Sequence, residues 1–166
     1  MYGLWGRLEQ AVRTGAPAAP TGGHLGDDAE RTRRFVMGMH SRALGLGRLI
    51  APAIDLAGRR RLLDVGAGPG TFSRMLAERY AALRITLLDL PGVLAVAREL
   101  TEACDAPIAE RIAHHPGSYR AGALPTGHDA VLYCGALHQE TDASAADLFA
   151  RMHAAHVGSM ADRNYG

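Results

Sequence analysis

The chain has 166 residues, 48% of them apolar, which is enough to bury one sizeable core but not two. Lysine and arginine number 18 against 17 aspartate and glutamate, for a net charge of +1, so nucleic acid is not an expected partner. Charged residues or glycine interrupt every apolar stretch, which excludes a membrane-spanning helix. Cys104 and Cys134 lie in apolar segments, and no leader pattern opens the chain. We therefore expect a reduced, cytoplasmic protein.

Residues 1–58 are expected to form a helical lead and a linker. Apolar residues recur at helical spacing over residues 2–13, and glycines and prolines then break any periodic element as far as Gly26. A second helix follows, capped by Asp27 or Asp28. Its apolar residues are Phe35, Val36, Met39, Leu44 and Leu46. The glycines within it, which indicate close packing or a bend, are Gly38, Gly45 and Gly47.

Over residues 59–157 short apolar runs alternate with amphipathic stretches, the pattern of βαβ units. Strands are expected at Arg61–Val65, Ile85–Leu88, Ile108–His114 and Ala130–Tyr133. Helices are expected at Thr71–Tyr80, Val93–Ala103 and Ser144–His156. Residues 158–166 form a tail without an apolar run for a further strand. The pattern predicts an α/β, Rossmann-like core with a parallel sheet.

A glycine-rich loop, Gly66-Ala67-Gly68-Pro69-Gly70, joins the first strand to the next helix. At such a junction, backbone N–H groups and a helix N-terminus meet a bound nucleotide. A dinucleotide fold would have its third glycine at the position of Thr71, so the spacing disfavours an NAD-dependent oxidoreductase. Asp64, just before the loop, would repel a pyrophosphate and attract an amino-bearing ligand. The loop therefore favours a sulfonium cofactor with an amino-acid tail.

Asp89 closes the second strand, where an acidic side chain can accept both ribose hydroxyls of an adenosine. Leu90 and Pro91 then turn the chain. The alternative is that the glycines only shape a tight turn and that Asp89 caps the following helix. Asp64, the glycine loop and Asp89 together favour the adenosine site.

Three stretches carry a resemblance to a known family: LLDVGAGPGTFSRMLAERY, ITLLDLPGV and PGSYRAGALPTGHDAVLYCGALHQE. They resemble the class I S-adenosylmethionine-dependent O-methyltransferases of the plant caffeate and the bacterial hydroxyneurosporene and polyketide-tailoring type. The resemblance runs from about Leu4 to about Val157. It implies S-adenosyl-L-methionine as cofactor and, as substrate, a small hydroxylated aromatic or polycyclic molecule of secondary metabolism.

The resemblance also assigns a cofactor site. Its expected residues are Asp64, Gly66, Gly68, Gly70, Asp89, Leu90, Ser118, Tyr119 and Cys134. Ser118 stands where the family commonly has an aspartate that reads the adenine amino group, and Tyr119 is the aromatic residue after it. Cys134 stands where plant members have a lysine near the cofactor.

His138 matches the family's general base, which takes the hydroxyl proton as the oxygen attacks the cofactor methyl. Histidine suits this role because imidazole exchanges protons near neutral pH. The alternative is a polar residue that merely ends the fourth strand. The other histidines, including the pair His114-His115 and His153 with His156, lack a third ligand at a recognised spacing, so no metal site is expected.

Phe35 and Met39 match an aromatic residue and a methionine of the family, which implies a role in the substrate pocket. Core packing would use the same residue types, so both interpretations stay open.

Full family members carry an N-terminal winged-helix domain for dimerisation and three strands after the position of the last helix here. We therefore expect a chain truncated at both ends, and the alternative function is a non-catalytic fragment or pseudoenzyme. The family's acidic residue that orients the histidine would also lie beyond residue 166. The strand Ala130–Cys134 would lose one neighbour, so we expect either a homo-oligomer through this edge or marginal folding.

Overall fold

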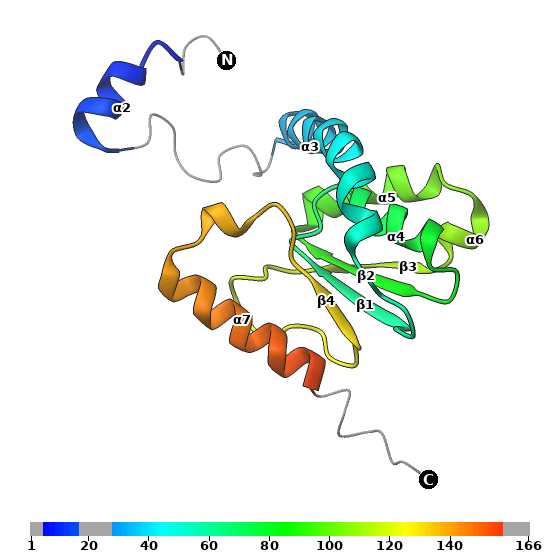
Figure 1. The fold of residues 1–166 in the computed structure, drawn as a ribbon. Coiled ribbons are helices and arrows are strands. Elements are labelled where there is room, and N and C mark those ends of the chain that lie inside the picture. Colours follow the sequence, from blue (N-terminus) through cyan, green and yellow to red (C-terminus); the bar gives the residue numbers. More distant parts are fainter. Residues whose placement is uncertain (1–4, 17–27, 158–166) are drawn as a thin grey trace.

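The computed structural model describes residues 5–16 and 28–157 (Figure 1). Its helices are α2 (Leu8–Thr14), α3 (Ala29–Ile50), α4 (Thr71–Arg79), α5 (Pro91–Glu102), α6 (Ala106–Ala109) and α7 (Asp142–Val157), with the 3₁₀ turns η1 (Ala51–Ala53) and η2 (Leu137–Gln139). Its strands are β1 (Arg61–Val65), β2 (Arg84–Asp89), β3 (Ile112–Pro116) and β4 (Ala130–Leu132). This α/β order confirms the predicted fold class.

The strands form one parallel sheet in the order β3-β2-β1-β4. Alternate residues of each strand face opposite sides, so the two faces have separate cores. On one face Leu62 and Ile85 pack with Leu76 of α4 and Leu94 of α5. On the other face, strand residues pack against α7, which Figure 1 shows apart from the other helices. The sheet is thus covered on both sides, as a parallel sheet requires.

Within residues 59–157 the expected elements agree with the structure except at the third strand. β1 has the predicted bounds, and β2, α4, α5, β4 and α7 differ by only a few terminal residues. The prediction of a strand over Ile108–His114 was wrong in its first half, because residues 106–109 form α6 and the strand begins at Ile112. Pro107 lies in the first turn of α6. Proline lacks the N–H that a strand donates but fits a helix N-terminus, which explains the shift.

Helix α3 begins at Ala29, and Asp28 is its N-cap, with the carboxylate accepting the N–H of Arg31 at 2.9 Å. Of the two expected caps, Asp27 lies outside the described residues. The helix crosses α4 and α5 (Figure 1). At Gly47 an added Cβ would collide with the sulfur of Met75, so this glycine allows the close approach of α3 and α4.

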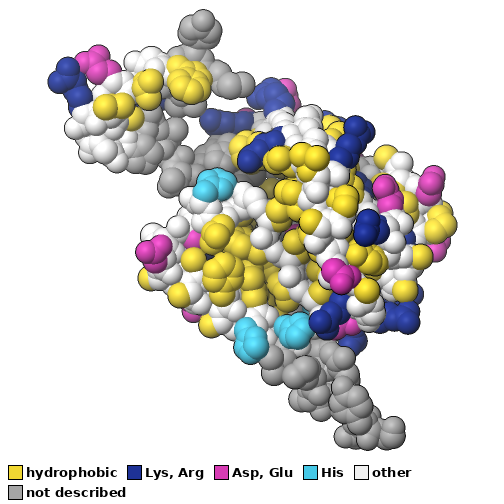
Figure 2. All heavy atoms as spheres, viewed as in Figure 1, with side chains coloured by type: hydrophobic (Ala, Val, Ile, Leu, Met, Phe, Trp, Pro, Cys, Tyr) yellow, Lys and Arg dark blue, Asp and Glu magenta, His cyan; other side chains and the backbone are white. Residues whose placement is uncertain are grey.

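Several apolar side chains are exposed. Figure 2 shows them over α2 and α3 and again over β4 and α7. They include Trp5, Leu8, Val12, Leu44, Leu46, Leu49, Leu137 and Phe149. Of the helix expected over residues 2–13, residues 8–13 are helical within α2, whereas Gly6 and Arg7 form a turn before it. Residues 2–4 lie outside the described part, as do most of the expected linker and the tail over 158–166. Among the helices that are described, none has the length and hydropathy to cross a bilayer.

Candidate functional site

The glycine loop turns the chain from the end of β1 into α4. Gly66, Gly68 and Gly70 have φ angles of 64°, 56° and 67°, a left-handed conformation that favours glycine. The N–H groups of Gly66 and Ala67 both donate to the Leu88 carbonyl of β2, at 2.9 and 3.2 Å. All three glycines are therefore needed for the backbone path, and the loop is tied to the neighbouring strand.

The surroundings of the glycines differ. A Cβ at Gly66 would lie 3.2 Å from the ring of Tyr119, and one at Gly70 would lie 2.7 Å from Leu87. A Cβ at Gly68 would meet no described atom within 4 Å. The middle of the loop thus presents bare backbone to open space, as a nucleotide-binding loop requires.

Asp89 lies at the carboxyl end of β2 and faces this loop. One carboxylate oxygen accepts the N–H of Gly68 at 2.7 Å, and the other accepts the N–H of Leu90 at 2.7 Å. Burial raises the pKa of Asp89, and the two N–H donors oppose that effect. Each carboxylate oxygen can accept more than one hydrogen bond, so acceptor capacity is left for ribose hydroxyls. This donor and acceptor set fits an adenosine group.

The sequence predicted that Asp64 would face a ligand, but the structure buries this residue. Its side chain is buried in β1 and accepts a hydrogen bond from the Ser73 hydroxyl of α4 at 2.6 Å. Burial raises the pKa of Asp64 to about 7, the Ser73 hydrogen bond lowers it, and the nearby Asp89 charge raises it. In this structure Asp64 links β1 to α4 beneath the loop.

A second polar cluster, His40, Thr71 and Arg74, supports the loop from the side of α3. His40 Nδ1 lies 2.8 Å from the Thr71 hydroxyl, and the buried Arg74 donates to the Pro69 carbonyl at 2.6 Å. Burial, and then the Arg74 charge, lower the pKa of His40. The cluster borders a cavity of about 570 Å³ between α3 and α4. The sequence did not predict this cluster. Spacing relates Thr71 to Arg74 on one helix, but it does not place His40 of α3 beside them.

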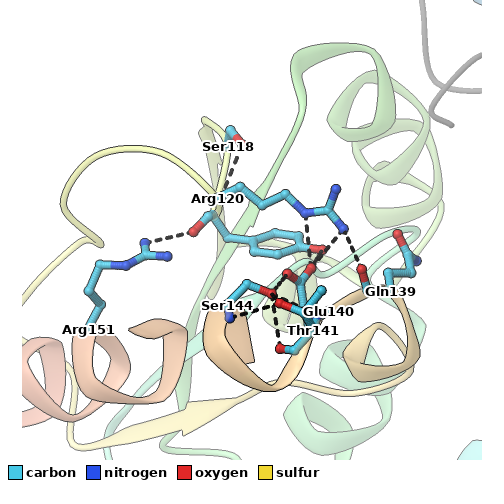
Figure 3. Close-up of polar contacts among 8 residues, drawn as sticks. Ser118, Arg120, Gln139, Glu140, Thr141, Ser144 and Arg151 are labelled. Atoms are coloured by element: carbon cyan, nitrogen blue, oxygen red, sulfur yellow. Dashed lines mark hydrogen bonds and ion pairs between the residues drawn. The ribbon is translucent and has the colours of Figure 1, made fainter. Parts of the chain in front are cut away.

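The segment after β3 lies against the glycine loop. The Tyr119 ring covers Gly66 and packs edge-to-face with Tyr133, with ring centroids 5.6 Å apart. The Tyr119 hydroxyl donates to Glu140 at 3.1 Å (Figure 3). The Ser118 hydroxyl accepts the N–H of Arg120 at 3.3 Å. Tyr119 thus lies beside the loop, while Ser118 is engaged in its own turn, and contact of either residue with the cofactor stays a prediction.

Residues after β4 complete this end of the sheet. Cys134 is half-buried, and burial, followed by the Asp64 charge, raises the pKa of its thiol. The Tyr133 hydroxyl is buried and has no hydrogen-bond partner among the described residues. Burial raises the pKa of Tyr133 most, and the neighbouring Tyr119 raises it further.

His138 lies on η2 and is exposed. Its ring makes no hydrogen bond to a described residue, so either ring nitrogen is accessible to a substrate. The turn reaches this place because Gly135, with φ of 85°, redirects the chain after β4. The structure therefore places His138 after the carboxyl end of β4, on the same edge as the loop and Asp89.

The two residues expected near the substrate lie on α3. Phe35 packs against a buried cluster of Val36, Val93 and Val96, which is a core contact. Met39 is half-buried. Among residues 5–16 and 28–157, no three histidine, cysteine, aspartate or glutamate side chains are grouped so as to hold a metal ion. The absence of a metal site stays a prediction.

A family model for the O-methyltransferase domain matches residues 5–159, and the chain belongs to this family. The 3-hydroxy-5-methyl-1-naphthoate 3-O-methyltransferase of Streptomyces sahachiroi is 36% identical over 137 residues, which are 81% of this chain and 39% of that protein. Demethylspheroidene O-methyltransferase of Rhodobacter capsulatus is 36% identical over 102 residues, 61% of this chain and 24% of that protein.

Solved structures agree with this assignment. The mitomycin 7-O-methyltransferase MmcR matches with a TM-score of 0.81 and 27% identity over 92% of this chain and 46% of that chain. Human N-acetylserotonin methyltransferase in complex with S-adenosylmethionine matches with a TM-score of 0.76 and 22% identity over 92% of this chain and 45% of that chain, and this likeness shows the fold alone. The chain spans less than half the length of these relatives.

Proposed function

We propose that this chain carries the cofactor site and the general base of an O-methyltransferase that uses S-adenosyl-L-methionine. The acceptor would be a hydroxyl of a small aromatic or polycyclic metabolite. The observation that supports this most directly is the contact of Asp89 with Gly68 at the open centre of the glycine loop. It places a turn of backbone without side chains beside a ribose acceptor at the carboxyl ends of the strands, where ligands bind in open α/β sheets.

The residues that would hold the cofactor follow from this geometry. The open backbone at Gly68 would face the nucleoside, with Gly66 and Gly70 shaping the turn, and Asp89 would accept the ribose hydroxyls. Tyr119 would keep the loop in place through its contact with Gly66. Asp64 would act from beneath, by holding β1 to α4 through Ser73. When bound, the cofactor supplies a methyl group on a positively charged sulfur.

His138 would act on the acceptor. One imidazole nitrogen takes the hydroxyl proton, so that the oxygen attacks as an oxyanion or with strong oxyanion character. The exposed ring makes no hydrogen bond to a described residue that would have to break first. Because the leaving group is already activated, the protein mainly has to align the reacting atoms within about 3–3.5 Å and remove this proton.

The acceptor class rests on the relatives. The name of the Streptomyces sahachiroi protein specifies a naphthoate, and that of MmcR specifies mitomycin. Phe35 and Met39 remain candidates for contact with such a ring system, although the packing of Phe35 on Val36 favours a core role for that residue.

Methyl transfer tests this proposal. The chain is incubated with isotopically labelled S-adenosylmethionine and a panel of hydroxylated naphthoates and polyketides, and labelled ether products are measured. We expect product with at least one phenolic acceptor. Binding of S-adenosylhomocysteine without any transfer would instead favour the non-catalytic alternative.

A further inference from the structure

Glu140 is the centre of the network drawn in Figure 3. Its Oε1 accepts hydrogen bonds from the Tyr119 hydroxyl at 3.1 Å and from Arg120 Nε and Nη2 at 3.0 and 2.8 Å. Its Oε2 accepts from the Ser144 hydroxyl of α7 at 2.9 Å. The Glu140 side chain is only 5% exposed. One buried carboxylate thus joins the segment after β3, the end of η2 and the start of α7.

The partners of Glu140 reach both halves of the proposed site. Tyr119 covers Gly66 of the glycine loop with its ring. Arg120 also donates to the backbone carbonyl of Gln139 at 3.3 Å, and Gln139 directly follows His138. The network therefore runs without a break from the glycine loop through Tyr119 and Glu140 to the turn that carries His138.

A buried carboxylate persists only when donors compensate its charge. Burial alone would raise the pKa of Glu140, but hydrogen bonds from Ser144, Arg120 and Tyr119 outweigh this effect and hold its pKa below the ordinary value. The carboxylate is therefore ionised at neutral pH, and its bonds to Arg120 are of the charge-assisted kind, which are the strong ones.

We propose that Glu140 is a positioning residue that fixes the turn carrying His138 to the cofactor loop through Tyr119 and Arg120. This inference rests on the proposed function, because it treats His138 as the base and the glycine loop as the cofactor site. Glu140 acts through these neighbours and not on the substrate. It orients the base in this chain through the backbone of η2, with no side-chain contact to the imidazole.

Hydrogen exchange tests the link without any cofactor. In Glu140→Gln the amide keeps the size of the side chain, but it loses the charge and one of the two acceptor atoms. We expect amide exchange to rise several-fold in two separate segments together, residues 118–121 and residues 137–140, while β1 and β2 keep their protection. Glu99→Gln, which removes an exposed carboxylate paired with Arg33 at 2.8 Å, is the matched control and should change neither segment.

Arg120→Gln provides a second variant that leaves Glu140 in place. It should produce the same paired increase, because it removes the ion pair and the bond to the Gln139 carbonyl. A rise in only one of the two segments, or in neither, in the folded variants would overturn the proposal.

Kinetics separates positioning from a general structural role. Glu140→Gln should lower kcat by about 10- to 100-fold, the cost of a misplaced reacting group, with little change in KM for the acceptor. In a His138→Ala background the same substitution should lower kcat by less than about 2-fold, since no base is left to position. Full additivity of the two losses would contradict the proposal.

If the parent chain shows no methyl transfer, the proposed function fails, and the exchange experiment alone decides whether Glu140 links the two segments.

Discussion

Asp89 and Gly68 are joined by a hydrogen bond of 2.7 Å between the carboxylate of Asp89 and the backbone N–H of Gly68. It connects the end of β2 to the centre of the loop between β1 and α4. The same carboxylate oxygen that fixes the loop retains a lone pair for a ligand hydroxyl. Loop geometry and ligand recognition therefore depend on one side chain.

Removing the proposed base should affect the rate far more than binding. His138→Ala is expected to lower the rate of methyl transfer by about 10²–10⁴-fold and to leave the affinity for S-adenosylhomocysteine within a few-fold, since a base acts only on the acceptor proton. His153→Ala, which alters an exposed histidine of α7, is the control. Full activity of His138→Ala would assign the base to another group or show that the acceptor reacts already ionised.

The buried Asp64 carboxyl should make folding stability pH-dependent. Its pKa is about 7 in the folded chain, so this acid binds its proton more tightly when folded. Its contribution to stability therefore falls as the pH rises from about 4 to about 7. Asp64→Asn keeps an acceptor for Ser73 and removes the titration. Thermal unfolding at several pH values should show a decline over this interval in the parent chain that is smaller in the variant. Parallel profiles would show that Asp64 is not buried as described.

Two glycines of α3 should respond unequally to alanine. At Gly45 an added Cβ meets no described atom within 4 Å, so Gly45→Ala should stabilise the fold by about 1 kcal/mol through helix propensity. At Gly47 the Cβ would collide with the Met75 sulfur, near the free end of a flexible side chain that would have to shift, so Gly47→Ala should gain less stability than Gly45→Ala. Urea unfolding of the two variants measures the difference. Equal stabilisation of both would mean that α3 does not press against α4 at this point.

The edge of the sheet at β4 should govern association of the 166-residue chain. β4 pairs with β1 only among the described residues, and its three residues are half-buried. An edge strand offers unpaired backbone groups to a second chain, and the exposed Leu137 and Phe149 lie in the segments that follow it. Light scattering with thermal unfolding at micromolar concentration should show either oligomers or a low melting temperature. A monodisperse monomer that melts cooperatively above about 60 °C would contradict this expectation.

The glycine loop and Asp89 could be predicted because local sequence determines them. Positive φ angles require glycine at Gly66, Gly68 and Gly70, and Asp89 directly ends an apolar strand. The start of β3 was predicted too early, because the apolar residues around Ile108 indicate a strand whereas Pro107 favours the start of a helix.

The contacts that link distant segments were not predictable. The Glu140 carboxylate meets Arg120 from 20 positions away, and His40 meets Thr71 from 31 positions away. Residue type and spacing carry no signal for such pairs, because the fold alone brings them together. The same holds for Asp64, whose burial against Ser73 depends on the packing of α4 on β1.

Calorimetric titration of the chain with S-adenosylhomocysteine and with NAD tests the proposed cofactor site most directly. We expect the chain to bind S-adenosylhomocysteine and not NAD. Asp89→Ala should weaken that binding by about 1–3 kcal/mol, because the ribose hydroxyls lose their acceptor and Gly68 loses its anchor. Glu30→Gln, a change at an exposed ion pair with Arg34 on α3, is the control and should bind like the parent chain. Equal affinity of Asp89→Ala and the parent chain for S-adenosylhomocysteine, or binding of NAD in its place, would contradict the assignment.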